Sequence, residues 1–487
     1  MLVTETVIVV GAGSAGCVAA ARLTEDPDRT VILLEAGGDR GHDPELQSLN
    51  WMDALAHRDV FYPDLFATKV QGGESRLYQR GRGVGGSAST NAMLALPGLP
   101  QDYDDYAERY GLTEWSWAHV EPWFAKLKPM LVRSTDAELT PVDRALLRSG
   151  GALGLRDDVD AYTAEDGSAR LYRTADRTGR RSSLELWLDP ARDRDNLVVR
   201  PDSQVDRLLL DGDRVRGVRL ADGEEVHGDR VILCAGVFES PCILMRSGLD
   251  RAGLGQGLQD HPAASVYVSL KPEYRETNRS VPCIGSVMRL SSSVGTGDLH
   301  LLPLHGELIS SDPPAHGLLM AAVMRTRSQG SLRLNPERPL APPIVDEAML
   351  THPDDRRAMR EAIAAVAAVL DGEAFSEIVE QVFIDERGTP IEVLQDDEAF
   401  DRWLSAYVGD YFHAVGTARM GRADDPAAVV DQLGNVHGLE GAAVWDASIL
   451  PEVPSANTHL PVVMLAERLS AAYRSGSLDS SVADDDQ

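Results

Sequence analysis

The stretch from Glu5 to Asp39 constrains the fold of this chain more than any other. An uninterrupted apolar run over Val7–Val10 is typical of a parallel strand that is buried on both faces. Three glycines in G-x-G-x-x-G spacing follow, then an alanine-rich helix over 17–23 and a second apolar strand over Thr30–Leu34, which ends in Glu35. This order of elements predicts the dinucleotide-binding unit of a doubly wound α/β fold.

Each glycine of this motif has its own expected role. Gly11 permits the tight turn, Gly13 lets the backbone approach a pyrophosphate, and Gly16 allows the helix to pack on the strand. The phosphates would lie at the helix N-terminus, where free N–H groups and the helix dipole favour an anion. Glu35 can accept hydrogen bonds from a ribose, and an acid in place of arginine disfavours NADP. This region alone leaves FAD and NAD open.

Length and charge limit the remaining possibilities. A chain of 487 residues predicts two domains, which can be interleaved, and a net charge of −29 argues against nucleic acid as a partner. No apolar run is long enough to span a membrane, and a first strand that begins by Thr6 leaves no room for a signal peptide. The four cysteines form no C-x-x-C pair, so we expect buried thiols in a reduced compartment, the cytoplasm, and no metal site.

Apolar periodicity outlines the rest of the chain. Alternation over 196–236 predicts successive strands with Asp-Gly turns, and the short apolar runs over 263–343 predict a separate antiparallel sheet. Residues 130–180 are charged and irregular, so loops and short helices are expected there. Amphipathic or apolar patterns predict helices over 102–110, 117–126, 356–370, 396–406 and 460–473.

Five blocks in this sequence resemble, in order, those of the glucose–methanol–choline (GMC) oxidoreductases, from Thr6 to about Ala472. They read "VGAGSAGCVAAARL…LLEAG", "GRGVGGSASTNAM", "CAGVFESPCILMRSGL", "GLQDHP", and the closing pair "FHAVGTARMG" and "VWDASILPEVPSANTHLPVVMLAERLS". The resemblance implies an α/β protein, α+β overall, in which a doubly wound FAD-binding domain is interleaved with an antiparallel-sheet substrate domain. The expected FAD-binding parts are 1–96, 195–262 and 411–475, the substrate parts are 97–194 and 263–410, and an acidic tail is 476–487.

The resemblance also implies which residues bind FAD. Glu35 would bind the adenosine ribose, Val205 the adenine, and Asp446 with Ala447 the pyrophosphate and ribityl chain. Thr90 stands where some members have a histidine that bonds covalently to flavin, so the FAD is expected to be non-covalent. The complete predicted cofactor set is Gly11, Gly13, Ser14, Gly16, Glu35, Ala36, Val84, Gly86, Ser87, Asn91, Ala92, Val205, Ala235, Asp446, Ala447 and Thr458.

The catalytic residues are predicted from the two closing blocks. His413 resembles the family's base, and an unperturbed pKa of about 6.5 suits an imidazole to take a hydroxyl proton near pH 7. Asn457 matches the position of a second polar residue that would hold the developing alkoxide, and His459 is its rival. His261, in "QDHP", is interpreted as structural.

The resemblance predicts an enzyme that oxidises an alcohol by passing a hydride to FAD. Its partners would be a small-molecule alcohol and an electron acceptor. The brief N-terminus and compact length are similar to the mycofactocin-linked branch, which would use a carrier other than oxygen. A hydroxynitrile lyase on the same fold, in which FAD stays idle, is the alternative. A purely NAD-dependent dehydrogenase leaves the second and last blocks unexplained.

Overall fold

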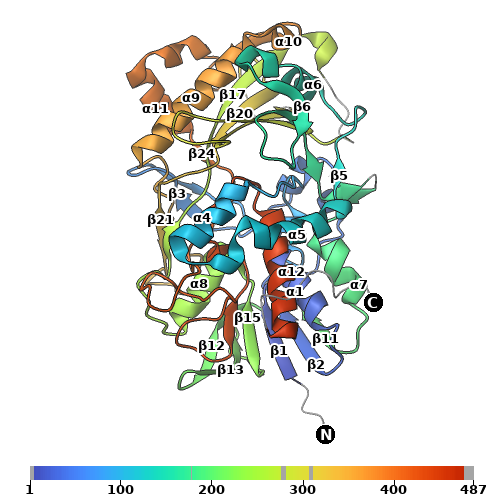
Figure 1. Cartoon of the computed structure of the whole chain (residues 1–487), viewed down its shortest axis with the longest axis vertical. Coiled ribbons are helices and arrows are strands. Elements are labelled where there is room, and N and C mark those ends of the chain that lie inside the picture. Colours follow the sequence, from blue (N-terminus) through green and yellow to red (C-terminus); the bar gives the residue numbers. More distant parts are fainter. Residues whose placement is uncertain (1–4, 177, 276–280, 307–310, 477–487) are drawn as a thin grey trace.

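The computed structural model describes residues 5–176, 178–275, 281–306 and 311–476. Figure 1 shows two stacked parts, each built on its own sheet. The lower part contains β1, β2, β11 and β15 with the helices α1 and α12, and the upper part contains β17 and β20 with α9 and α11. The mixed α/β fold expected from the sequence is confirmed. The predicted acidic tail lies, from residue 477 onward, outside the described residues.

The lower part is a five-stranded parallel sheet that draws on distant stretches of the chain. Its order is β11-β2-β1-β15-β25, and every neighbouring pair is parallel. Helix α1 connects β1 to β2, and α12 packs beside α1. The bounds are β1 Glu5–Val10, β2 Arg29–Leu34, β11 Leu197–Arg200, β15 Arg230–Leu233, β25 Ala442–Val444, α1 Ser14–Leu23 and α12 His459–Ser475.

Two glycines allow α1 to begin directly against β1. Gly11 has a φ of +99°, a left-handed conformation that favours glycine. A Cβ on Gly16 would lie 1.8 Å from the carbonyl oxygen of Gly11, so the helix and the loop touch backbone to backbone. This contact agrees with the packing role expected for Gly16.

The upper part is an eight-stranded sheet in the order β23-β17-β20-β19-β18-β7-β6, with β24 paired to β17. It is antiparallel except for the pairing of β6 with β7, which confirms the antiparallel sheet predicted over 263–343. The bounds are β6 Arg156–Asp160, β7 Gly167–Arg170, β17 Pro262–Leu270, β18 Ser286–Leu290, β19 Leu299–His305, β20 Gly317–Val323, β23 Val379–Phe383 and β24 Gly409–Asp410.

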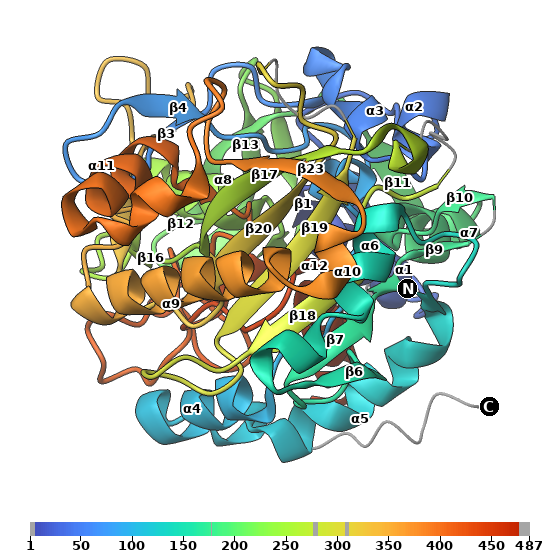
Figure 2. The ribbon, with the colours of Figure 1, turned by 90° about the horizontal axis from the view of Figure 1, so that it is seen from above.

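The two faces of this sheet have different neighbours. Leu301 and Leu319 belong to the core beneath α9, which crosses the outer face of the sheet in Figure 2. Leu302 and Leu304 belong to a core on the opposite face, because side chains alternate along a strand. That inner face is turned toward the lower part of the molecule.

Residues 130–180 differ from the expectation of loops and short helices. Helix α6 is present there, but six short strands are present as well, and two of them, β6 and β7, extend the eight-stranded sheet. Strand β7 pairs with β18, more than a hundred residues away, and β6 pairs with β7, and these pairings make strands of the charged segment. The remaining bounds are α6 Pro141–Leu147, β5 Val132–Arg133, β8 Tyr172–Arg173, β9 Ala175–Asp176 and β10 Gly179–Arg180.

Smaller sheets and helices complete the fold, and the predicted helices are confirmed within a few residues of their bounds. The sheets are β12-β13-β14 and β16-β21-β22-β3-β4. Their bounds are β12 Val205–Asp211, β13 Arg214–Leu220, β14 Glu225–His227, β16 Gln256–Leu258, β21 Gly330–Arg333, β22 Ile344–Asp346, β3 Phe66–Thr68 and β4 Ser75–Leu77. The helices are α2 Pro44–Gln47, α3 Met52–Leu55, α4 Pro100–Tyr110, α5 Trp117–Leu127, α7 Asp189–Ala191, α8 Gly236–Arg246, α9 Pro353–Leu370, α10 Glu373–Ser376 and α11 Asp397–Tyr407.

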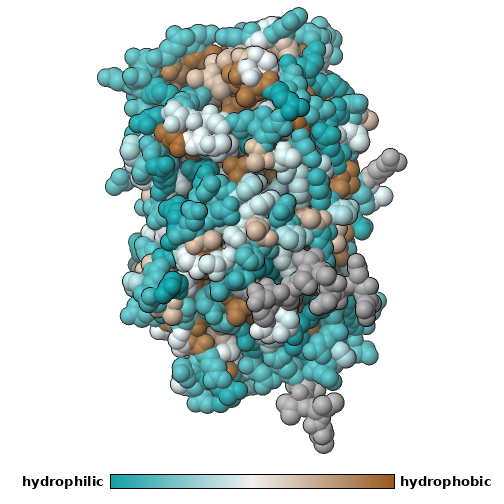
Figure 3. All heavy atoms as spheres, viewed as in Figure 1, coloured by the Kyte–Doolittle hydropathy of each residue, from teal (hydrophilic) through white to brown (hydrophobic). Residues whose placement is uncertain are grey.

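The surface is consistent with the acidic composition. The face in Figure 3 is mostly hydrophilic, with small scattered apolar patches. Within the described residues, no helix has both the length and the apolar content needed to cross a bilayer.

Candidate active site

One cavity is lined by residues of both parts of the molecule. It extends from the glycine loop at Gly11 and Gly13 to the inner face of the eight-stranded sheet at Leu302 and Leu304. Every predicted site residue lines it except Gly16 and Val84. Gly16 lies behind the loop, against Gly11, and Val84 is buried in the core of the lower part.

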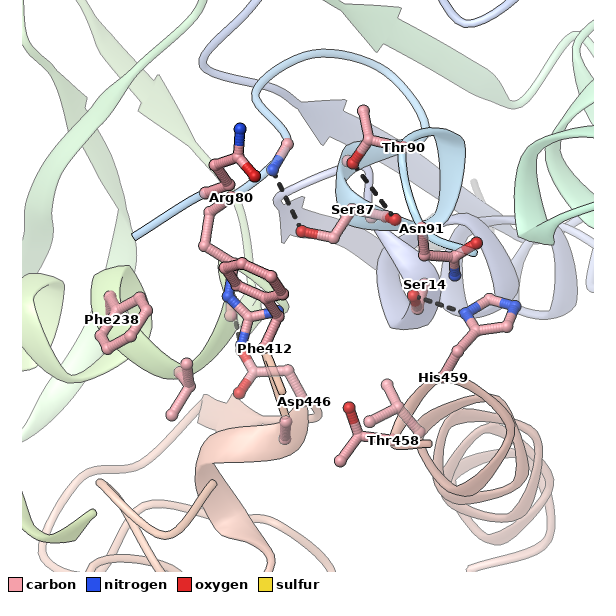
Figure 4. Close-up of a pocket in the computed structure, with 18 of the residues that line it drawn as sticks. Ser14, Arg80, Ser87, Thr90, Asn91, Phe238, Phe412, Asp446, Thr458 and His459 are labelled. Atoms are coloured by element: carbon pink, nitrogen blue, oxygen red, sulfur yellow. Dashed lines mark hydrogen bonds between the residues drawn. The ribbon is translucent and has the colours of Figure 1, made fainter. Parts of the chain in front are cut away.

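Two helix N-termini meet at the cavity. Gly13 is the N-cap residue of α1 and has no side chain that could cap the helix. Thr458 is the N-cap residue of α12, and in the described structure its side chain makes no capping hydrogen bond. Ser14 and His459, the first residues of these helices, are joined by a hydrogen bond of 2.8 Å between Oγ and Nδ1 (Figure 4). Uncapped backbone N–H groups and two positive helix ends suit a pyrophosphate, so the residues present fit the phosphates of FAD.

The Glu35 carboxylate joins three loops around the cavity. Oε1 accepts hydrogen bonds from the backbone N–H groups of Gly37 (3.0 Å) and Gly83 (2.9 Å), and Oε2 accepts from Ala12 (2.9 Å). Burial raises the pKa of Glu35, and the three N–H donors act against that rise. Oε2 accepts only one of these hydrogen bonds and Glu35 lines the cavity, which fits the predicted contact with a ribose hydroxyl.

Asp446 is a second buried carboxylate at the cavity wall. It accepts hydrogen bonds from the backbone N–H of Gly236 (2.8 Å) and from the hydroxyls of Ser240 (2.5 Å) and Ser448 (2.6 Å). These contacts fix the start of α8 beside the loop that follows β25. Asp446 therefore orders the wall at the position where the pyrophosphate and ribityl chain are expected.

His413 and Asn457 lie together at the other end of the cavity. The Nδ2 atom of Asn457 is 3.3 Å from Nε2 of His413, and both side chains are buried. Burial, followed by the nearby His261 and Arg80, lowers the pKa of His413 well below its ordinary value, so the ring is neutral near pH 7. Of the two rivals for the second polar position, Asn457 contacts His413, whereas His459 contacts Ser14.

A buried group of charges lies behind His413. Lys69 forms ion pairs with Glu347, at 3.1 Å, and with Asp410, and all three side chains are at most 6% exposed. Burial raises the pKa of Glu347 to about 8, and the Lys69 ammonium opposes the shift. Asp410 ends β24, three residues before His413, so this ion-pair group anchors the segment that carries the imidazole.

The cavity wall next to His413 is mainly apolar. It includes Leu302 and Leu304 on β19 and Met320 on β20. The sequence did not single out these residues, because β19 has apolar residues on both faces. No alternation of polar and apolar residues along the strand shows which side chains face the cavity. Other side chains of this wall include Trp51, Leu94, Ile284 and Tyr411.

Arg80 is a further cavity residue that the sequence analysis missed. Its guanidinium lies over the rings of Tyr78, at 5.2 Å, and Phe238, at 5.7 Å. Figure 4 labels it among the side chains that line the cavity. The sequence feature that could have identified Arg80 is its position immediately before the second glycine cluster, residues 81–86.

Comparison with known proteins gives consistent results along the chain. Residues 5–263 match the N-terminal profile of the GMC oxidoreductases, and residues 326–466 match the C-terminal profile. The chain is 31% identical to 5-(hydroxymethyl)furfural oxidase from Methylovorus sp. (strain MP688), over 96% of this chain and 99% of the relative. It is 32% identical to oxygen-dependent choline dehydrogenase 1 from Chromohalobacter salexigens, over 96% and 94%.

A solved structure gives the same result. Pyridoxine 4-oxidase from Mesorbium loti superimposes with a TM-score of 0.86 and 27% identity, over 97% of this chain and 99% of that one.

Proposed function

This chain belongs to the GMC oxidoreductase family and is an FAD-dependent alcohol oxidoreductase, and we propose that it oxidises uncharged primary alcohols carried on a flat ring. The observation that carries the proposal is the buried pair of His413 and Asn457, next to an apolar wall and in the same cavity as the glycine loop.

The proposed step assigns one task to each residue of the pair. Nε2 of neutral His413 takes the hydroxyl proton, and the amide N–H of Asn457 donates a hydrogen bond to the alkoxide oxygen that develops. Bound FAD would supply the hydride acceptor. Because His413 and Asn457 are both buried, the two interactions are stronger than they would be in solution.

The carboxylates in the cavity argue against a cationic substrate. In the described part of the chain, four carboxylates line the cavity, and each is already engaged. Glu35 accepts from backbone N–H groups, Asp446 from serines, Asp410 pairs with Lys69, and Glu239 lies 3.4 Å from Arg246. A quaternary ammonium such as choline would enter without a free carboxylate to balance it, which is costly for a desolvated charge.

The names of the relatives support a ring-bound hydroxymethyl group. Hydroxymethylfurfural and pyridoxine, named for two of the similar proteins, both carry a hydroxymethyl group on a flat ring. Side chains such as Leu302, Leu304 and Trp51 offer an apolar surface for such a ring.

The flavin linkage and the electron acceptor complete the proposal. Thr90 lines the cavity and has no imidazole to bond to flavin, which supports non-covalent FAD. Two relatives are named oxidases and a third is named oxygen-dependent, and these names favour oxygen over the mycofactocin-linked carrier expected from the sequence. None of the names favours a hydroxynitrile lyase.

The test is an anaerobic titration of the purified protein with three alcohols: benzyl alcohol, a linear aliphatic alcohol and choline. Benzyl alcohol should bleach the flavin absorbance most rapidly and choline least. The variant His413→Asn should retain its flavin but bleach at least about 100-fold more slowly. Acid precipitation should release the flavin, and readmitted air should restore its absorbance with release of hydrogen peroxide.

The opposing results are equally specific. Rapid bleaching by choline would contradict the uncharged substrate, and bound flavin that no alcohol reduces would favour the lyase. Flavin that stays with the precipitate would contradict non-covalent binding.

A further inference from the structure

Two buried imidazoles touch at the base of the cavity. Nδ1 of His261 lies 3.0 Å from Nδ1 of His413, and the rings are nearly perpendicular, at 86°. Burial lowers the pKa of both histidines, that of His261 to about 3, so both rings are neutral. A hydrogen bond between two such nitrogens needs one proton, so one ring donates and the other accepts.

The surroundings of His261 are compatible with this ring as the acceptor. The nearby backbone carbonyls of Pro454 and Met324 raise the pKa of His261 against the effect of burial, and within the described residues Nε2 of His261 forms no hydrogen bond. A carbonyl oxygen can only accept a hydrogen bond, so these neighbours favour a proton on Nε2, and Nδ1 then presents a lone pair to His413.

The surroundings of His413 lead to the same assignment. The amide Nδ2 of Asn457 lies 3.3 Å from Nε2 of His413, and an NH₂ group is a donor. A proton on Nε2 would place two donors opposite each other. The proton of His413 therefore belongs on Nδ1, between the two rings.

We propose that His261 is a positioning residue that holds His413 in the Nδ1–H tautomer, which leaves Nε2 unprotonated and directed at the substrate hydroxyl. This inference rests on the proposed function of His413 as the base. Without an acceptor at Nδ1, an imidazole of histidine favours the Nε2–H tautomer, which cannot take a proton at that nitrogen. The sequence interpretation of His261 as structural is thereby extended to a role in the reaction.

The backbone fixes the two rings relative to each other. Oδ1 of Asp260 accepts hydrogen bonds from the backbone N–H of His261, at 2.7 Å, and from that of His413, at 2.9 Å. Oδ2 accepts from the hydroxyl of Tyr78 at 2.6 Å. One buried carboxylate thus sets the spacing of both histidines, which lie 152 residues apart in the chain.

Protons and electrons balance in this arrangement. The hydroxyl proton moves to Nε2 of His413, and bound FAD would supply the acceptor for the hydride, so the alcohol would be oxidised by two electrons. The imidazolium that forms keeps its Nδ1–H hydrogen bond to His261. Because both rings are buried, the lone pair of His261 stabilises that charge more than it would in water.

The test compares three variants of the flavin-loaded enzyme. His261→Leu removes the acceptor, whereas His261→Asn places Oδ1 close to the former Nδ1 and can still accept from His413. His300→Leu is the matched control, because His300 is equally buried but, among the described residues, neither of its ring nitrogens has a hydrogen-bond partner. The readouts are steady-state kinetics and the ¹⁵N spectrum of histidine-labelled protein, which reports the tautomer of His413 without turnover.

The wild type should show Nδ1–H on His413. His261→Leu should shift the ring toward Nε2–H and lower kcat by about 10- to 100-fold with little change in KM, the range observed when the partner that orients a functional histidine is removed. His261→Asn should restore the tautomer and most of kcat, and His300→Leu should change neither.

An Nε2–H resonance for His413 in the wild type would overturn the inference, as would equal losses in His261→Leu and His300→Leu. These results are distinct from failure of the proposed function. The tautomer of His413 is measured whether or not an alcohol is oxidised. Alcohol oxidation by an enzyme in which His413 carries its proton on Nε2 would contradict only the role of His261.

Discussion

The two ends of the cavity are built in different ways. At the phosphate end, Gly11, Gly13 and Glu35 lie within 25 residues of one another, and the Glu35 carboxylate accepts hydrogen bonds from backbone N–H groups. The glycine loop itself packs backbone to backbone. At the substrate end, His413 and Leu302 come from separate stretches, and the contacts join one buried side chain to another. Backbone groups therefore take part in the contacts of the cofactor end, whereas contacts between side chains support the substrate end. Three comparisons test this difference.

The largest expected effect is at the substrate end. Lys69→Met leaves the Asp410 carboxylate buried without its cation, whereas Glu347, with a pKa of about 8, is mostly protonated at pH 7. The free energy of unfolding should fall by about 3–5 kcal/mol at pH 7. Part of this loss should return at lower pH, because protonation removes the remaining unpaired charge. Urea denaturation at two pH values measures both effects.

The matched control is Lys128→Met, since Lys128 is 40% exposed and lies 3.4 Å from Asp160. A pair at the surface should contribute at most about 1 kcal/mol. Equal losses in the two variants would mean that the buried charges do not stabilise the substrate end.

A smaller effect is expected from the glycine loop. The Cβ of Gly16→Ala would meet the Gly11 carbonyl at 1.8 Å, and the overpacking should cost about 1–3 kcal/mol. The Cβ of Gly13→Ala meets no protein atom closer than 4.0 Å, so stability should change little while bound flavin decreases. Thermal unfolding and the ratio of flavin to protein absorbance separate the two roles. Equal stability of the two variants would mean that the backbone contact between Gly16 and Gly11 does not stabilise the cofactor end.

The smallest expected effect concerns how stability depends on pH. Burial lowers the pKa of His300 well below 6.5, so below that pH the unfolded chain binds a proton that the folded chain does not. This linked stability is present above pH 6.5 and is lost as the pH falls. Between pH 7.5 and 5.5 the wild type should therefore lose about 1.4 kcal/mol more than His300→Leu.

The comparison variant for this measurement is His227→Leu, because the side chain of His227 is 70% exposed. Its free energy of unfolding should change with pH as that of the wild type does across the same pH range. If the free energy of unfolding of His300→Leu changed with pH as that of the wild type does, burial of His300 would not contribute to the loss of stability in acid.

The sequence by itself determined the elements whose signals are local. The apolar run of β1, the glycines and the apolar pattern of α12 predicted a strand, a turn and a helix, because each depends on neighbours a few residues away. The same locality explains why most of the predicted cofactor set lines one cavity. Ordered motif blocks also brought His413 and Asn457 into one hypothesis although they lie 44 residues apart.

The tertiary structure decided what depends on distant partners. The sequence favoured Asn457 and left His459, two residues further on, as its rival; in the structure Asn457 contacts His413, while His459 contacts Ser14, 445 residues away. Pairing of β7 with the distant β18, and of β6 with β7, likewise made strands in a charged segment. A side chain's direction and a marginal strand's conformation are set by packing against remote elements, which no local pattern encodes.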